Sequence, residues 1–384
     1  MPAEELNAAR SLERTVLITG ATGFVGAHLL VELAKIAGIG RIYVLLRRSG
    51  RQLDLESKLA LSFNRFELVP LQPSPRIVIV EADLALPTLG LSTATQSMLA
   101  NEVDTIYHVG AQVNHLLPYS ELRTSNVEST AQLARLSLQG RPKVLNFVST
   151  LGAAARRTPQ GLLAEDFPDD TPLESSMGYF QSKWASERLL ARVHASGYPA
   201  NIFRLGRITG HSVTGVSLHQ DNQLFMLIKG CIQLGAAPMM ERLINMTPVD
   251  TISRLMAAPE FLGTGGQVFN AFNGAELVSW REIIDWLAAQ GYVMEQMPFS
   301  SWQRRLDAIA EDNAIYKFLP LYRKDDAEHR VLSSAINIDQ YESKFAMRAM
   351  SRNGIAYEKR KGELLTTYFE YLWRSGFLTH PAER

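Results

Sequence analysis

A glycine-rich turn between an apolar strand and a helix constrains this chain more than any other feature of its sequence. The run 15–19 (TVLIT) is apolar and β-branched, as expected of a strand buried on both faces. Gly20, Gly23 and Gly26 follow it, and apolar residues then recur at helical spacing as far as Ile36. A strand, a glycine turn and a helix in this order form a dinucleotide-binding unit, in which backbone N–H groups at the helix start bind a diphosphate.

The second expected strand, 42–46, ends in Arg47 and Arg48. Folds of this kind that select NAD place an acidic residue near the end of this strand, where it binds the ribose 2′-hydroxyl. A planar guanidinium suits a 2′-phosphate instead, so the two arginines indicate NADPH as the cofactor. A solvated basic loop is the alternative interpretation of the same residues.

Further strands are predicted by apolar runs at 77–80, 103–109, 144–148 and 201–205. The segment 247–273 predicts a helix and a strand that rejoin the same sheet. Helical patterns separate these runs. Strands and helices that alternate at this spacing predict an α/β fold with a Rossmann-type, doubly wound parallel sheet.

A length of 384 residues allows one large domain or two modest ones. After the sixth strand the alternation is lost, and from 275 onward only helical patterns are visible. We therefore expect a smaller, mainly helical C-terminal domain that faces the substrate. The expected boundaries are a linker at 1–14, an NADPH-binding Rossmann domain at 15–210 joined by 247–273, and the helical domain at 211–246 and 274–384.

Composition excludes several classes of protein. Lys plus Arg and Asp plus Glu each number 39, so no overall field favours nucleic acid or an anionic membrane. Cys231 is the single cysteine, so an internal disulfide is excluded, and its apolar helical surroundings favour a core position.

No membrane-spanning run or signal peptide is visible, so we expect a cytoplasmic protein. His108 and His115 lack partners at metal-ligand spacing, so we expect no metal.

Tyr179 and Lys183 are spaced i, i+4 in an expected helix at 178–196, so their side chains share a face. A tyrosine with its ordinary pKa of about 10 is a poor acid–base catalyst, and an adjacent ammonium favours its phenolate. The lysine can also bind the nicotinamide ribose. Thr150 ends the fifth strand, at the edge of a parallel sheet where ligands collect. The loop 152–176 is longer than a connector needs to be and is expected at the mouth of the site.

Further residues are expected to contact the dinucleotide. Asp83 and Leu84 follow the third strand, where the chain faces adenine, and the small residues Gly110 and Ala111 allow it to pass close to a ribose. Asn126 is expected to open the next helix. The expected cofactor-binding residues are Gly20, Thr22, Gly23, Phe24, Val25, Gly26, Arg47, Arg48, Asp83, Leu84, Val109, Gly110, Ala111, Asn126 and Lys183.

These motifs together resemble the extended short-chain dehydrogenase/reductases. The shared elements are TGATGFVG, Arg47, Asp83-Leu84, NFVST and Tyr179-Phe-Gln-Ser-Lys183. The finer pattern IYVLLRR, ADLALPTLGLS, DTIYHVGAQVNHLLPYSELRTSNVEST and GYFQSKWASERLL is similar to the thioester reductase domains of nonribosomal peptide and polyketide synthetases. Relatives of those domains occur in carboxylic acid and aminoadipate reductases. The resemblance covers about 15–254.

The resemblance implies NADPH, a catalytic triad of Thr150, Tyr179 and Lys183, and an acyl or peptidyl thioester on the phosphopantetheine arm of a carrier protein. The product is an aldehyde, which a second NADPH can reduce to an alcohol. No phosphopantetheine attachment motif is visible, so the carrier is expected in trans or elsewhere in a larger synthetase. The alternatives are a fatty acyl-CoA or carboxylic acid reductase, a nucleotide-sugar epimerase or dehydratase, and a non-enzymatic NADPH-sensing regulator.

Overall fold

The computed structural model describes residues 13–48, 53–69, 74–323 and 338–383, so most of the expected linker 1–14 lies outside the described residues. The chain forms two compact units. Unit 1 comprises Met1–Leu205, Asp250–Ala271 and Ser343–Ile355, and unit 2 comprises Gly206–Val249, Phe272–Glu342 and Ala356–Arg384.

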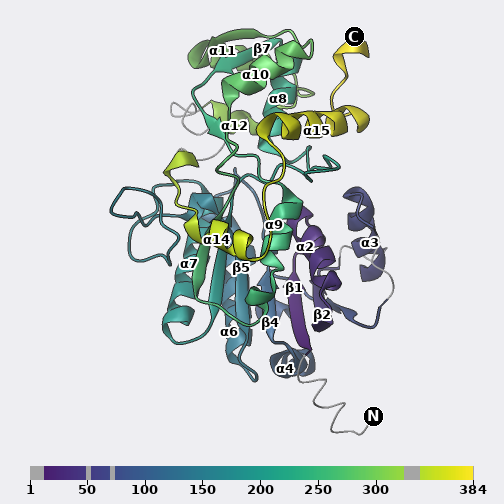
Figure 1. Cartoon of the computed structure of the whole chain (residues 1–384), viewed down its shortest axis with the longest axis vertical. Helices are drawn as coiled ribbons and strands as arrows, with labels where there is room; N and C mark the ends of the chain where they lie inside the picture. The colour runs from purple at the N-terminus through teal and green to yellow at the C-terminus, as the bar shows by residue number, and fades with distance from the viewer. Residues whose placement is uncertain (1–12, 49–52, 70–73, 324–337, 384) are drawn as a thin grey trace. The chain divides into compact units, whose positions relative to one another are not determined.

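Unit 1 is built on a seven-stranded sheet with the order β3-β2-β1-β4-β5-β6-β9, in which every neighbouring pair is parallel (Figure 1). The chain adds strands in one direction from β1 to β3 and in the other from β4 to β9, so the direction switches between β1 and β4. This confirms the predicted Rossmann-type sheet. The strands are β1 (Arg14–Thr19), β2 (Ile39–Leu46), β3 (Ile77–Glu81), β4 (Thr105–His108), β5 (Val144–Thr150), β6 (Ala200–Leu205) and β9 (Gln267–Ala271).

Helices cover both faces of this sheet. Leu99 of α4, Leu133 of α6 and Leu190 of α7 join the apolar core on one face. Tyr107 points to the opposite face, where its hydroxyl donates to the carbonyl of Met256 in α9 at 2.9 Å. The helices that contribute to unit 1 are α2 (Phe24–Lys35), α3 (Leu55–Arg65), α4 (Thr93–Glu102), α5 (Tyr119–Arg123), α6 (Ser129–Leu138), α7 (Gly178–Ala195), α9 (Val249–Met256) and α14 (Lys344–Arg352).

Asn126 does not open a helix, contrary to expectation. After α5 the chain continues through one π-helical turn, Thr124–Glu128, directly into α6, so Asn126 lies inside a continuous helical segment. A π turn contains one extra residue, so the apolar positions before and after it no longer follow one helical repeat. The polar run 124–126 also resembles a helix N-cap in the sequence, which explains the wrong prediction. Turns of this kind occur frequently at functional sites.

The helix α14 belongs to unit 1, which corrects its expected place within 274–384. The buried Glu165 carboxylate accepts the backbone N–H groups of Phe345 at 2.5 Å and Ala346 at 3.0 Å, at the N-terminus of this helix. It also accepts the N–H of Asn270 in β9 at 3.0 Å. A carboxylate complements the positive end of a helix. This cap comes from far along the chain, so no local pattern could predict it.

Unit 2 is mainly helical and also contains short strands. Trp280 and Trp302 are its largest fully buried side chains. The strands β10 and β11 correct the expectation that only helices follow residue 275; they are two and four residues long, too short for a visible alternation. The elements that begin in unit 2 and lie within it are α8 (Gln223–Leu234), β7 (Ala236–Met239), β8 (Leu243–Ile244), β10 (Val278–Ser279), α10 (Trp280–Ala289), β11 (Glu295–Pro298), α11 (Phe299–Arg305), α12 (Leu319–Tyr322) and α15 (Lys361–Arg374).

The Glu165 cap generates a stability prediction. Glu165→Ala leaves two buried N–H groups and one partly buried N–H group without their acceptor, so we expect the free energy of unfolding to fall by about 1–3 kcal/mol in urea titrations. Arg352→Ala is the matched control on the same helix. It removes an exposed ion pair with Glu260, which should be worth about 1 kcal/mol or less. An equal loss in the two variants would contradict the role given to Glu165.

Candidate active site

The glycine turn after β1 is shaped by close backbone approach. Gly20 has a φ of 76°, and a Cβ at this position would lie 2.5 Å from the backbone nitrogen of Gly110. A Cβ on Gly26 would lie 2.1 Å from the carbonyl oxygen of Gly20, so the first turn of α2 packs directly on the loop. Gly23 is the N-cap of α2, and no side chain caps this helix or places an acid in its first turn. Its N-terminal N–H groups can therefore bind an anion.

A cavity of about 440 Å³ lies at the carboxyl ends of β1, β2 and β4, at the switch point of the sheet. This is where open α/β sheets bind their ligands. The predicted cofactor-binding residues that line it are Gly20, Thr22, Arg47, Asp83, Leu84, Gly110 and Ala111. The predicted residues that do not line it are Gly23, Phe24, Val25, Gly26, Arg48, Val109, Asn126 and Lys183. The cavity and the uncapped helix start together fit a dinucleotide.

Two cations line the outer part of this cavity. Lys58 of α3 was not found by sequence reasoning, because a helix position that becomes adjacent only on folding carries no local signal. Its ammonium donates to the carbonyl of Arg47 at 2.5 Å. Burial lowers the pKa of Lys58, the nearby Arg47 lowers it further, and Asp83 opposes both effects. Arg48 instead forms an exposed ion pair with Glu81, with Nη2 and Oε2 2.8 Å apart.

A buried histidine links the glycine turn to the next strand. His108 Nδ1 lies 2.9 Å from Thr19 Oγ1, and its Nε2 lies 3.1 Å from Thr130 Oγ1. Thr19 Oγ1 also accepts the backbone N–H of Gly110 at 3.0 Å. Burial lowers the pKa of His108 to about 3, and the charge of Lys183 lowers it as well, so the ring is neutral at physiological pH. The histidine therefore holds the ends of β1 and β4 in register beside the cavity.

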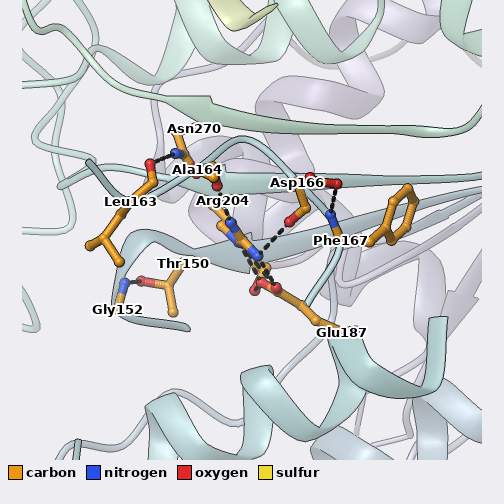
Figure 2. Close-up of polar contacts among 10 residues, drawn as sticks. Thr150, Gly152, Leu163, Ala164, Asp166, Phe167, Glu187, Arg204 and Asn270 are labelled. Carbon is orange, nitrogen blue, oxygen red and sulfur yellow. Dashed lines mark hydrogen bonds and ion pairs between the residues drawn. The ribbon is translucent and has the colours of Figure 1, made fainter. Parts of the chain in front are cut away.

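The candidate catalytic residues come from β5 and α7, which pack against each other. Lys183 is 2% exposed; its ammonium donates to the carbonyl of Val148 at 2.7 Å and lies 4.5 Å from the ring centroid of Phe147. Thr150 ends the same strand, and its hydroxyl accepts the N–H of Gly152 at 3.4 Å (Figure 2). Tyr179 lies one turn before Lys183 on α7 and is 9% exposed.

The pKa shifts of this pair correct one expectation. Burial raises the pKa of Tyr179 above its ordinary value, whereas the sequence suggested that a lysine would depress it. The physical reason is that the ring is desolvated and the Lys183 ammonium donates to the strand instead. Burial lowers the pKa of Lys183 to about 7, although the Glu187 carboxylate opposes the shift. The Tyr179 hydroxyl is therefore protonated at neutral pH, and the pKa of Lys183 lies near neutrality.

Two further residues organise the surroundings of Tyr179. Asn126, inside its π turn, accepts the N–H of Gln112 at 2.8 Å and donates to its carbonyl at 3.1 Å. Its amide also donates to Ser182 Oγ on α7 at 3.0 Å, so it ties the segment after β4 to the helix of Tyr179. The ring of His115 meets Tyr179 edge-on, with centroids 5.6 Å apart. Both residues were singled out from the sequence, but neither set of contacts could be predicted from it.

Metal-ligand clusters and membrane-spanning helices are absent from the part of the chain that the structure describes. No group of three or more His, Cys, Asp or Glu side chains there is arranged to hold a metal ion. No helix within the same ranges has the length and apolar character needed to cross a membrane. Cys231 is fully buried.

Comparison with known proteins defines the class of this fold and site. The profile of the Male sterility protein family, a family of NAD-binding domains, matches residues 18–256. This range contains the glycine turn, the cavity and all three candidate catalytic residues. The chain therefore belongs to the Male sterility protein family.

The chain is also similar to parts of much longer proteins. It is 30% identical to the L-2-aminoadipate reductase large subunit of Penicillium chrysogenum over 96% of this chain and 28% of the relative. It is 34% identical to a linear gramicidin synthase of Brevibacillus parabrevis over 78% of this chain and 6% of the relative. The chain thus spans less than a third of either protein.

Among solved structures, the terminal R domain of the myxalamid PKS-NRPS biosynthetic pathway has a TM-score of 0.82 and 33% identity, covering 96% of this chain and 92% of that one. A thiolation-reductase di-domain from an archaeal nonribosomal peptide synthetase shares the fold, with a TM-score of 0.76 and 22% identity over 97% of this chain and 78% of that one. These similarities confirm the predicted relationship to the reductase domains of peptide and polyketide synthetases.

The close packing of the glycine turn generates a prediction. Gly26→Ala forces a methyl group against the Gly20 carbonyl, so we expect about 1–3 kcal/mol of destabilisation and at least about tenfold weaker dinucleotide binding. Gly38→Ala is the matched control, because no neighbouring atom lies within 4 Å of its added Cβ. Thermal melts and fluorescence titration measure the two effects. Unchanged binding in a folded Gly26→Ala protein would show that the turn does not form the cofactor site.

Proposed function

We propose that this chain reduces an acyl or peptidyl thioester carried on a phosphopantetheine arm and releases it as an aldehyde, with NADPH as the hydride donor. A second reduction at the same site can take the aldehyde on to the alcohol. The placement of a buried Lys183 under the end of β5, one turn after Tyr179, carries this proposal. It rests also on the chain's relatives, which include reductases and multidomain peptide synthetases.

The cofactor proposal depends on Arg47 and Lys58. Both line the cavity beyond the end of β2, where the ribose of the adenosine half binds in this fold. A 2′-phosphate would pair with the guanidinium and the ammonium, which favours NADPH over NADH. Arg48 is engaged by Glu81, so we assign it no part in this recognition. Asp83 and Leu84 would contact the adenine, and Gly110 and Ala111 the ribose.

In the proposed reaction Tyr179 and Thr150 hold the thioester oxygen. The bound dinucleotide supplies hydride to the carbonyl carbon. Negative charge then develops on the oxygen, and Tyr179 donates a proton or hydrogen bond to it. A tyrosine whose pKa is raised by burial is protonated at neutral pH, as a donor must be. Lys183 binds the nicotinamide ribose and attracts the dinucleotide while it is charged. Collapse of the hemithioacetal breaks the C–S bond, the hydroxyl proton passes to the departing sulfur, and the products are the aldehyde and the pantetheine thiol.

The proposed partner is an acyl or peptidyl carrier protein that bears the thioester. One structural relative is a thiolation-reductase di-domain, and the matched relatives in sequence are larger than this chain. A tethered thioester reaches the site at high effective concentration, so weak contacts with the acyl group suffice. The direct test supplies synthetic acyl-pantetheine thioesters with NADPH and identifies the product by mass. Aldehyde or alcohol is expected, and an unreacted thioester would contradict the proposal.

The role of Tyr179 is tested by one substitution. Tyr179→Phe removes the donor and keeps the ring, so turnover should fall by about 10²–10⁴ while NADPH binding is retained. Tyr198→Phe, beyond the far end of α7, is the matched control and should have wild-type rates. Single-turnover kinetics measures the effect. A Tyr179→Phe enzyme with near-normal turnover would require the proton donor to lie elsewhere.

Cofactor selectivity gives a second test. Arg47→Ala should raise the NADPH Michaelis constant about 10- to 100-fold, the loss expected for one charge-assisted hydrogen bond, and spare NADH. Lys58→Ala should act in the same direction. Arg48→Ala is the control and should change neither constant much. Equal use of NADPH and NADH by the wild-type protein would refute the selectivity.

A further inference from the structure

A fully buried ion pair lies beneath the candidate active site. Arg204 of β6 and Glu187 of α7 are 1% and 0% exposed, and Arg204 Nη2 lies 2.6 Å from Glu187 Oε2. Arg204 Nε also donates to both carboxylate oxygens, at 3.1 Å and 3.0 Å. Burying two charges costs free energy that their attraction barely recovers, so stability alone does not explain such a pair.

Glu187 connects this pair to the strand that carries Thr150. The hydroxyl of Ser149, the preceding residue, donates to Glu187 Oε1 at 2.5 Å. Ser149 is buried, and Thr150 is the last residue of β5. The carboxylate therefore fixes the strand end from which the Thr150 hydroxyl projects.

Arg204 connects the same pair to the long loop that follows Thr150. Its Nη1 donates to the carbonyl of Ala164 at 2.9 Å and its Nη2 to the carbonyl of Asp166 at 3.2 Å, as Figure 2 shows. Asn270 of β9 holds the adjacent carbonyl of Leu163 at 3.1 Å. The loop expected at the mouth of the site is thus attached to the ion pair through its backbone.

Glu187 also lies one helical turn after Lys183, and its charge favours the ammonium. Tyr179 lies one turn before Lys183 on the same helix, and the charge of Lys183 acts on His108 of β4. Both have pKa values displaced away from neutrality, to higher and lower pH respectively. Of Lys183, Tyr179 and His108, only Lys183 therefore has a pKa between about 5 and 9.

We propose that Glu187 and Arg204 are positioning residues of the reductase site. Their ion pair holds the end of β5, and with it the Thr150 hydroxyl, and it holds the loop between β5 and α7 in place. This inference rests on the proposed function, because kcat is measured on the thioester. The effect of the Glu187 charge on the pKa of Lys183 is measured by dinucleotide binding alone.

The test removes both charges together, because Glu187→Gln alone leaves Arg204 buried without a counter-charge. The variant is Glu187→Gln with Arg204→Met. Its matched control is Asp104→Asn with Arg141→Met, which removes an ion pair with a 2.8 Å contact at the opposite end of the same sheet. Ser149→Ala is a milder variant that keeps the ion pair and cuts only its link to the strand.

NADPH affinity is measured by fluorescence across about pH 5–9, with kcat and KM for an acyl-pantetheine thioester measured alongside. In the wild type, affinity should fall as pH rises through the Lys183 pKa of about 7, because the ammonium loses its charge. The double variant should move this inflection down by about one pH unit and lower kcat about tenfold, with KM changed about threefold or less. Ser149→Ala should lower kcat without moving the inflection.

The control should melt at a lower temperature yet keep the wild-type inflection and kcat. A double variant with an unmoved inflection and wild-type kcat would overturn the inference, as would a control with the same shift. A wild type that binds NADPH with the expected inflection but turns over no thioester would refute the proposed reaction instead. In that case the shift in the binding inflection still decides whether the ion pair sets the charge of Lys183.

Discussion

The hydrogen bond from the buried Lys183 ammonium to the Val148 carbonyl is the interaction on which the site depends. A cation that is 2% exposed has lost most of its hydration and needs compensation from its surroundings. The strand carbonyl, the face of Phe147 and the Glu187 carboxylate supply it. The compensation is incomplete, so the lysine titrates near pH 7 and its charge responds to small changes nearby.

A second constraint shapes the cavity that we propose for the dinucleotide. Gly20, Gly26 and Gly110 approach one another so closely that side chains are excluded. Thr19 and the neutral His108 tie the same strand ends together through hydrogen bonds. The switch between β1 and β4 is therefore a rigid edge with an uncapped helix start, next to the strand that carries Thr150. The residues proposed for cofactor binding and those proposed for catalysis therefore lie along one edge of one sheet.

Much of this could be predicted from the sequence, because the decisive signals are local. The glycine turn, the alternation of strands and helices and the i, i+4 pair on α7 each lie within a short stretch of chain. The contributions of Lys58, Glu165 and Arg204 could not be predicted, since each acts on residues far away in sequence. The π turn at Asn126 was missed because it shifts the helical period, and the direction of the Tyr179 pKa shift because burial is not visible in a sequence.

We propose that hydride passes from a nicotinamide dinucleotide to a carrier-bound carbonyl at Tyr179 and Lys183. The most direct measurement uses NADPH deuterated at the transferable C4 position and an acyl thioester loaded on a carrier protein, with the released product analysed by mass spectrometry. The account predicts an aldehyde that carries deuterium at its carbonyl carbon, and an alcohol that carries a second deuterium where reduction continues. A released product without deuterium, or an acid in its place, would contradict the account.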